Sequence, residues 1–516
     1  MQTEKEYTAG REVLGLRCES VGEYSLPDYN GDVRKVLFIR PKAFPSGTFV
    51  GDGVLEISGI IEYEVVYLDS DNVLTHAQFS TDYDAALKVN AESYVDSDVV
   101  TEISSYSVRL TGPRKFSAKA ILDSSVAINE SRHITVEGDA FMEYEPEYVG
   151  ESVKVLSMAF ATADSREIEE EIVSIDGAIA DEVVVLLCDA HAETGACDVS
   201  EVGLNVKGDV IIDMLYVNGD ADPIRVNRVI SYSEDVSLAD ASDFENVSAI
   251  LEIGSLKSSI IPTEDGVKLC VAVKVTPRVR AKRNTLVNLV SDAFLKERGT
   301  DNEYADFNYT EHVCTETKEE RRELKYPLAE LDTDGVSDIL YSSATPRIEG
   351  YDVTRDGVSI YGEVKVSAVA IQENDEGART YAPIKFSVPY EQNVNIDYQI
   401  TDNMHINCHS NVTNLSLNLD ANHLGVALTL CTSVGVLADK KRRHLAASYI
   451  TDEEYTLDDS IVTVYYPDAS EKLFDIARKF HTSTRSIAEC NRLTEAVFSS
   501  SQDTLCALGV SKLIIK

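Results

Sequence analysis

Stretches in which apolar and polar residues alternate one by one dominate the chain. From Val36 onward, valine, isoleucine and tyrosine recur at every second position, which favours half-buried β-strands. Helical spacing is confined to a few places, among them residues 155–160 and 285–296, and predicts short helices there. Residues 299–323 are polar and acidic, and predict a mobile connection. The pattern as a whole predicts a mainly β protein.

One alternating segment with an internal glycine occurs three times. Its glycines are Gly59, Gly208 and Gly362, separated by 149 and 154 residues, a spacing that suits whole domains. About 22 residues before each glycine lies a short apolar segment. An isolated glycine in a strand marks a bulge or a close backbone approach. The repeat predicts three tandem antiparallel β-sandwich-like domains.

A second alternating stretch supports the division into repeats. We place its copies at 106–110, 268–275 and 426–431. The expected boundaries are an N-terminal segment at 1–30, β domains at 31–150, 165–285 and 325–445, and a small module at 458–516.

The last fifty residues have a different pattern. Residues 462–465 alternate as a strand, 471–480 and 484–491 have helical spacing, and 512–515 form an apolar strand. This order predicts a small α/β module of the βααβ type.

Charge narrows the classes of partner. The net charge is -41, from 88 acidic and 47 basic side chains. Nucleic acid and anionic lipid are not expected as partners, because their binders need lysine and arginine to displace counterions. Two basic runs, 278–283 and 440–444, break the acidic pattern. We interpret each as a solvated strand end or as a segment facing an acidic neighbour.

Nothing in the pattern predicts export or membrane insertion. The N-terminus lacks a basic start followed by an apolar core, and no run of eighteen apolar residues occurs. The nine cysteines are odd in number and scattered, as expected for thiols in a reducing cytosol.

Candidate chemistry is sparse. His405 and His409 would share one face of a strand with Cys408 on the other, too few ligands for a zinc site. Phosphate-loop, nucleophile-elbow and metalloprotease motifs do not occur. We therefore expect no catalytic residue, no metal, no cofactor and no enzymatic activity.

The C-terminal module resembles a LysM module. Its four elements have the LysM order, and Asn491 with Leu493 stands where such modules place Asn-x-Leu after the second helix. LysM modules generally have Gly-Asp-Thr-Leu before the first helix, whereas this chain has a longer turn without glycine at 467–473. Glycan grooves of the family border that turn, so the departure favours a protein ligand.

Three β repeats followed by one LysM-like module resemble the SipL-type spore coat morphogenetic proteins of endospore-forming Firmicutes. The repeats resemble SPOCS domains through the three strand glycines and through Asp292-Ala293-Phe294. The resemblance implies a non-enzymatic scaffold in the mother-cell cytoplasm, at the forespore surface and spore coat. It also implies other spore coat proteins as partners, with the LysM module docking onto the sporulation ATPase that forms the coat's basement layer.

The resemblance places the partner-binding surface on the first helix of the module and the turn before it. Its candidate residues are Tyr466, Asp468, Lys472, Asp475, Lys479, Arg485 and Asn491. The alternative is a protein that binds peptidoglycan or another GlcNAc glycan through LysM. The sequence leaves open the oligomeric state, the partner of each repeat and the orientation of the repeats.

Overall fold

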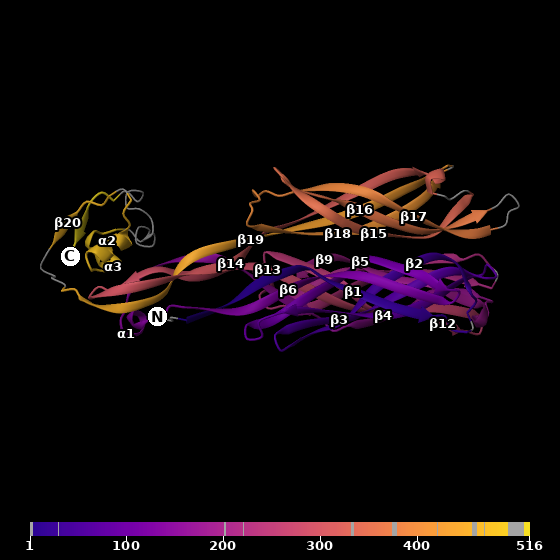
Figure 1. The fold of residues 1–516 in the computed structure, drawn as a ribbon, viewed down its shortest axis with the longest axis horizontal. Helices are drawn as coiled ribbons and strands as arrows, with labels where there is room; N and C mark the ends of the chain where they lie inside the picture. The colour runs from indigo at the N-terminus through magenta and orange to yellow at the C-terminus, as the bar shows by residue number, and fades with distance from the viewer. Residues whose placement is uncertain are drawn as a thin grey trace.

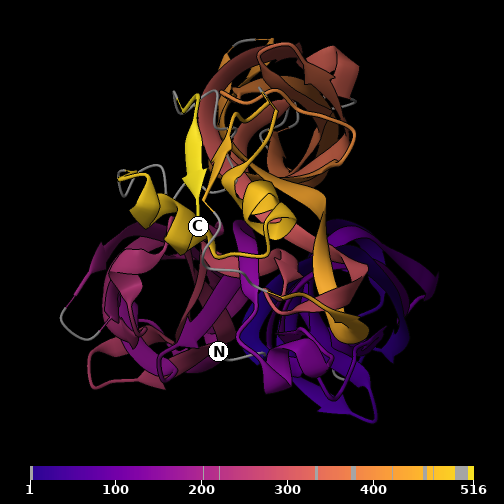
Figure 2. The same ribbon diagram turned by 90° about the vertical axis from the view of Figure 1, so that its left-hand side faces the viewer.

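The computed structural model describes residues 4–28, 30–200, 203–219, 221–331, 335–373, 379–420, 422–456, 462–468, 470–493 and 510–516. The chain is mainly β, and its strands pair antiparallel in several sheets, as predicted. Most of the strands gather in three lobes, which stand at the corners of a triangle when the molecule is viewed along its long axis (Figure 2).

Lobe 1 is formed by the first six strands. They are β1 (Glu4–Ser25), β2 (Val33–Gly51), β3 (Val54–Asp69), β4 (Leu74–Lys88), β5 (Tyr94–Gly112) and β6 (Lys115–Thr135). Two three-stranded sheets, β2-β3-β4 and β1-β6-β5, enclose one hydrophobic core that includes Tyr63, Tyr67 and Phe116. The residues expected as an N-terminal segment therefore supply strand β1, because β6 offers them a partner along nearly their whole length.

Lobe 2 repeats this arrangement with one interruption. Its strands are β7 (Glu147–Thr162), β8 (Arg166–Asp176), β9 (Val183–Val199), β10 (Gly203–Asn218), β11 (Ile224–Ser237), β12 (Asn246–Pro262) and β13 (Gly266–Phe294). The sheet β9-β10-β11 faces a sheet in which β13 pairs with β12, β7 and β8. The segments β7 and β8 both pair with β13 and so take the place that β1 has in lobe 1.

Lobe 3 has the same order of strands. They are β14 (Arg298–Pro327), β15 (Val336–Thr354), β16 (Gly357–Glu373), β17 (Arg379–Asn395), β18 (Met404–Asp420) and β19 (His423–Glu454). The sheets β15-β16-β17 and β14-β19-β18 enclose a third core. Short helical turns join the strands at α1 (Asp139–Glu143), Ala180–Glu182, Ala241–Asp243 and Leu328–Leu331.

Three local predictions are wrong. Residues 155–160 and 285–294 are not helical but lie in β7 and β13, and residues 299–323 form most of β14. Val287 and Leu289 are buried while Leu286 is 59% exposed, so the apolar residues also fit a period of two. These residues form strands because β13 pairs with β7, and β14 pairs with β19 along its whole length. Such tertiary pairing overrides local helix propensity.

The three copies of the second alternating stretch do not lie in equivalent strands of the three lobes. Its copies at 268–275 and 426–431 lie in β13 and β19, whereas 106–110 lies in β5. The strand of lobe 1 that pairs like β13 and β19 is β6. Its inward positions hold Phe116, Ala118 and Ala120, and the alanines weaken the apolar alternation there.

The three glycine segments are the central strands β3, β10 and β16 of their sheets. Each glycine lies opposite a register shift in the preceding strand, after Pro45 in β2, between Thr194 and Cys197 in β9 and after Ile348 in β15. A Cβ on Gly208 or Gly362 would lie 2.3 or 2.0 Å from a backbone oxygen of that strand. The bulge in the preceding strand and the close approach to the glycine therefore occur together, because a glycine has no side chain to keep the bulged backbone away.

A further core joins the three lobes at their centre. It is built from the same positions of each repeat, which are Leu37 and Val66 in lobe 1, Leu186 and Leu215 in lobe 2, and Leu340 and Val369 in lobe 3. Each of the first residues lies 22 positions before its glycine, and each of the second lies 7 positions after it. The lobes are thus arranged around a pseudo-threefold axis.

The long strands β13, β14 and β19 continue beyond the lobes as a stem, and the C-terminal module lies at its end (Figure 1). The module consists of β20 (Thr463–Tyr465), α2 (Leu473–Lys479), α3 (Thr484–Cys490) and β21 (Leu513–Ile515). Its two strands pair antiparallel, and the order of its elements is the predicted one.

Candidate functional site

The C-terminal module has its own small core beneath α2 and α3. Leu473, Ile476 and Ile487 from the helices pack against Leu513 and Ile515 of β21, and all five are buried. Helix α3 begins where Ser483 accepts a hydrogen bond from the backbone N–H of Ser486 at 2.9 Å, an N-cap that satisfies one free donor of the first turn.

The side chain of Asn491 is used inside the module. Its Nδ2 donates to the carbonyl oxygens of Ile487 at 2.8 Å and of Ile514 at 2.6 Å, and its Oδ1 accepts from the backbone N–H of Ile514 at 2.6 Å. These bonds hold β21 against the end of α3. The structure therefore gives Asn491 a role in the fold of the module, and leaves its side chain few groups for a partner.

One face of the module is docked on the stem. Phe294, at the end of β13, belongs to the module's core and contacts the ring of Phe474 edge-on, with 5.2 Å between ring centroids. Arg478 lies over both rings, forms an ion pair with Asp292 at 2.5 Å, and donates to the carbonyl oxygen of Ala293 at 3.2 Å. The Asp292-Ala293-Phe294 segment is thus the docking point of the module.

A second contact fixes the start of α3. The carboxylate of Glu147, the first residue of β7, accepts from the backbone N–H of Thr484 at 3.3 Å and from its hydroxyl at 3.0 Å. The sequence gave no indication of Glu147 as a docking residue. Only the pairing of β7 with the end of β13 brings it to the module.

The other predicted partner-binding residues remain on the accessible surface of the module. Tyr466 is 69% exposed, Asp468, Asp475, Lys479 and Arg485 are exposed, and Lys472 is half-buried. Lys479 donates to the hydroxyl of Tyr465 at 2.9 Å, and Arg485 pairs with Glu489 at 2.9 Å. Helix α2 therefore presents Asp475 and Lys479 to solvent and turns Phe474 and Arg478 toward the stem.

The histidine pair predicted on β18 is divided between two carboxylates. His405 lies 2.7 Å from Asp439, and His409 lies 3.5 Å from Glu102 of lobe 1. Burial raises the pKa of the Cys408 thiol between them to about 11, which keeps it protonated at neutral pH. Among the described residues, no group of three or more His, Cys, Asp and Glu side chains is placed to hold a metal ion.

Titratable groups with strongly shifted pKa values gather at the junction of the lobes. Burial lowers the pKa of Lys42 to about 7 and raises that of Tyr341 to about 12. Arg40 pairs with Glu64 at 2.6 Å and with Asp189 of lobe 2, whose carboxylate accepts from the Tyr341 hydroxyl of lobe 3 at 3.4 Å. The cluster ties three lobes together, and this structural role accounts for the shifts.

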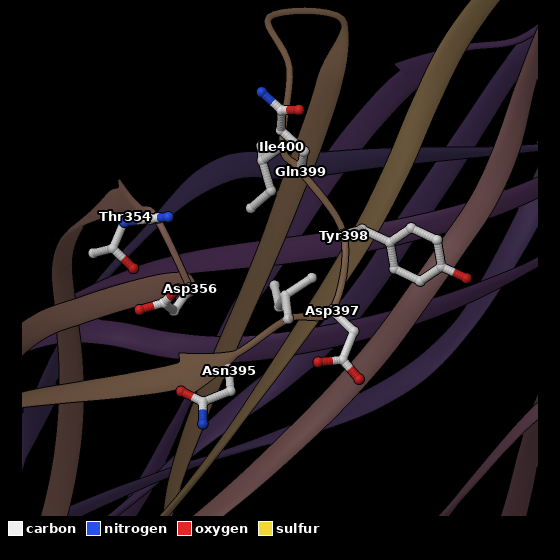
Figure 3. Close-up of a pocket in the computed structure, with 9 residues that line it drawn as sticks. Thr354, Asp356, Asn395, Asp397, Tyr398, Gln399 and Ile400 are labelled. Atoms are coloured by element: carbon white, nitrogen blue, oxygen red, sulfur yellow. The ribbon is translucent and has the colours of Figure 1, made fainter.

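An open hollow of about 690 Å³ lies at the end of lobe 3 where β17 leads into β18 (Figure 3). The turn at 354–356 and the connection at 395–400 border it. Figure 3 shows the Tyr398 ring directed away from Thr354. Its lining holds Thr354, Asp356 and Asp397, but in the described part of the chain no hydrogen bond joins the threonine hydroxyl to either carboxylate as a nucleophile and its base would be joined.

The chain has no match among protein-family models, curated proteins or solved structures. No helix in the described ranges is long and apolar enough to cross a membrane. The candidate site therefore rests on the geometry of this structure alone. It is the exposed surface of a βααβ module docked at the end of a three-lobed body.

Proposed function

We propose that the protein is a non-enzymatic scaffold for spore coat assembly in the mother-cell cytoplasm. In this proposal the three lobes are tandem copies of one β-sandwich domain of the SPOCS type, and the C-terminal module is a LysM module. The lobes link other coat proteins at the forespore surface, and the module docks onto the ATPase of the coat's basement layer.

The observation that carries the proposal is the two-sided geometry of the module. Phe474 and Arg478 bind the stem, while Tyr466, Asp475 and Lys479 face outward. A module held rigidly at the end of a long body can bind a partner there while the lobes bind others. Modest contacts then add through effective concentration.

The repetition of the lobes supports the same reading. Their strand order, bulge-facing glycines and central core positions recur three times. Three copies of one surface suit a protein that binds a repetitive assembly, because several weak contacts made together give a tight attachment.

Deleting 461–516 tests the division of roles. We expect the truncated chain to keep its far-ultraviolet circular dichroism and its cooperative unfolding, and to lose recruitment to the forespore in sporulating cells. The surface variants Asp475→Lys and Lys479→Glu, made separately in the full chain, should lower binding of the purified ATPase about tenfold without changing the melting temperature. Arg321→Glu, an exposed residue of β14, serves as the control.

Unchanged localisation of the truncated chain would contradict the proposal. Retention of the full chain on purified peptidoglycan, lost on deletion of 461–516, would favour the alternative of a GlcNAc-glycan binding protein.

A further inference from the structure

A cavity of about 420 Å³ lies where lobe 1 meets lobe 3, next to the stem. Strands β1 and β6 form one wall, and β14 and β19 form the other. Val155 of β7 contributes from lobe 2. We call it the cationic cavity, after Arg11, Arg132, Lys440 and Lys441, which line it together with Tyr7 and Tyr309.

The two walls have the same composition because of strand register. Tyr7 of β1 stands directly opposite Arg132 of β6, and Tyr309 of β14 stands directly opposite Lys440 of β19. Directly opposite residues of antiparallel strands project from the same face of a sheet. Each wall therefore presents a tyrosine and a cation.

The charge of the lining is opposite to that of the chain. The whole sequence carries a net charge of -41, yet four cations and a single carboxylate, Asp439, line this cavity. That carboxylate already accepts from the Thr310 hydroxyl at 2.8 Å and lies 2.7 Å from His405 Nε2.

Each of the four cations forms its ion pair with a carboxylate of its own wall. Arg11 and Arg132 share Glu130 at 3.2 and 2.9 Å, so one carboxylate serves two guanidinium groups of lobe 1. In lobe 3, Lys440 pairs with Glu311, and Lys441 pairs with Asp306 at 2.7 Å. Among the described residues, no ion pair joins these cations to the opposite lobe. Positive side chains therefore reach the cavity from both walls, each paired with a carboxylate of its own wall. An anion between the walls would be attracted by both sets.

The guanidinium of Arg11 also has an unused donor. Its Nε is buried and has no hydrogen-bond partner within the described part of the chain. A guanidinium carries five N–H donors, and a buried donor without an acceptor costs free energy. The Arg11 side chain as a whole is 40% exposed, so other N–H groups of the guanidinium remain open to an acceptor in the cavity.

We propose that the cationic cavity binds a small phosphorylated molecule. The forks of Arg11 and Arg132 and the ammonium of Lys440 suit a phosphate group, whose oxygens accept several charge-assisted hydrogen bonds. The volume falls in the range of small-molecule sites, so the cavity has room for more than a phosphate group alone. The inference rests on these residues and is independent of the proposed function.

Phosphorus NMR titration of the full chain with AMP and with pyrophosphate tests the proposal. Adenosine serves as the uncharged comparison. We expect the phosphorus resonances to broaden and the melting temperature to rise with AMP or pyrophosphate, and neither melting shift nor saturable binding with adenosine. If pyrophosphate saturates the site and AMP does not, the site recognises inorganic phosphate groups. If AMP binds more tightly than pyrophosphate, the site recognises a phosphate ester together with its organic group.

Matched variants distinguish the loss of a cation in the cavity from a change in the net charge of the protein. Arg11→Gln and Lys440→Gln should each weaken binding about tenfold, because each removes a charge-assisted hydrogen bond. Arg17→Gln and Lys325→Gln remove the same charges from the same lobes, at residues paired with Asp123 and Asp420 on the surface, and should leave affinity unchanged.

Should either site variant fail to fold, Lys441→Gln, whose side chain is 62% exposed at the cavity, replaces it. No binding of either phosphate compound up to about 5 mM, or equal losses in site and control variants, would overturn the proposal.

Discussion

At the scale of single residues, ion pairs between lobes use the basic runs that interrupt this acidic chain. Arg278 and Arg280 of β13 both bind Asp98 of lobe 1, with 2.6 Å between Arg280 Nη2 and Asp98 Oδ2. The Asp98 side chain is 13% exposed. Burial raises the pKa of Asp98, but Arg280 and Arg278 lower it by more, so the carboxyl titrates below its usual range.

Asp98 therefore links stability to pH in one direction. A carboxyl whose pKa is lower in the folded state contributes stability above its unfolded pKa of about 3.9, and loses it as the pH falls through the folded value. We expect Asp98→Asn to reduce the free energy of unfolding at pH 7 by about 3 kcal/mol, because the largely buried Arg280 loses its carboxylate partner and Arg278 keeps only Glu252. The difference from the unmodified chain, measured by urea unfolding, should shrink below about pH 4.

Asp123→Asn is the matched control, since Asp123 pairs with Arg17, whose side chain is 67% exposed. A surface pair contributes at most about 1 kcal/mol. Equal losses in the two variants would show that burial between the lobes adds nothing to the Asp98 pairs.

At the scale of the element, a strand glycine and the bulge opposite it form one unit. The unit recurs in β3, β10 and β16, and each time the preceding strand shifts its register beside the glycine. The shift bends and twists the strand at that point. The close approach, rather than a special backbone angle, requires glycine, since neither Gly59 nor Gly208 nor Gly362 has a positive φ.

Gly362→Ala tests this unit. The added Cβ would lie 2.0 Å from the carbonyl oxygen of Arg347, so the strands must move apart, and we expect a loss of about 2 kcal/mol in urea unfolding. Gly435→Ala in β19 is the control, because its Cβ would meet no atom closer than 3.8 Å. That variant should be neutral or slightly stabilising, since alanine narrows the unfolded ensemble. Equal effects would contradict the role of the close approach.

At the scale of the whole molecule, the three lobes form one body around a shared core. Leu37, Leu186 and Leu340 occupy equivalent positions and meet at the pseudo-threefold axis. Leu37, Leu186 and Leu340 belong to the sheets β2-β3-β4, β9-β10-β11 and β15-β16-β17. In each sheet the leucine lies on the face that points away from the lobe's own core. A single lobe would expose this apolar surface to water, so association of the lobes is favoured by its burial.

Leu186→Asp should open this body. A carboxylate at a side chain that is 1% exposed is costly to bury, so we expect the lobes to separate and the radius of gyration measured by small-angle X-ray scattering to increase. Circular dichroism should still report β structure. Leu286→Asp, at a leucine that is 59% exposed on β13, should leave the radius of gyration unchanged. An unchanged radius for Leu186→Asp would contradict the shared core.

The candidate site was predictable in part. The order of elements in the C-terminal module followed from helical spacing at 471–480 and 484–491. Most of the residues predicted to bind a partner lie on the exposed surface of the module, as expected. Asn491 could not be recognised as a structural residue, because its partner Ile514 is brought close only by the folded module. Glu147 was missed for the same reason, since its acceptor role depends on where α3 lies.

By itself the sequence determined the predominance of strands, the threefold repetition and the place of the glycines, because alternation and glycine act through local geometry. Tertiary structure decided that 285–294 and 299–323 are strands and that the lobes share a core. Those outcomes depend on pairing partners more than a hundred residues away, as between β14 and β19, or on a different lobe. A local pattern carries no record of such contacts, since the free energy that selects them arises only when the distant segments meet.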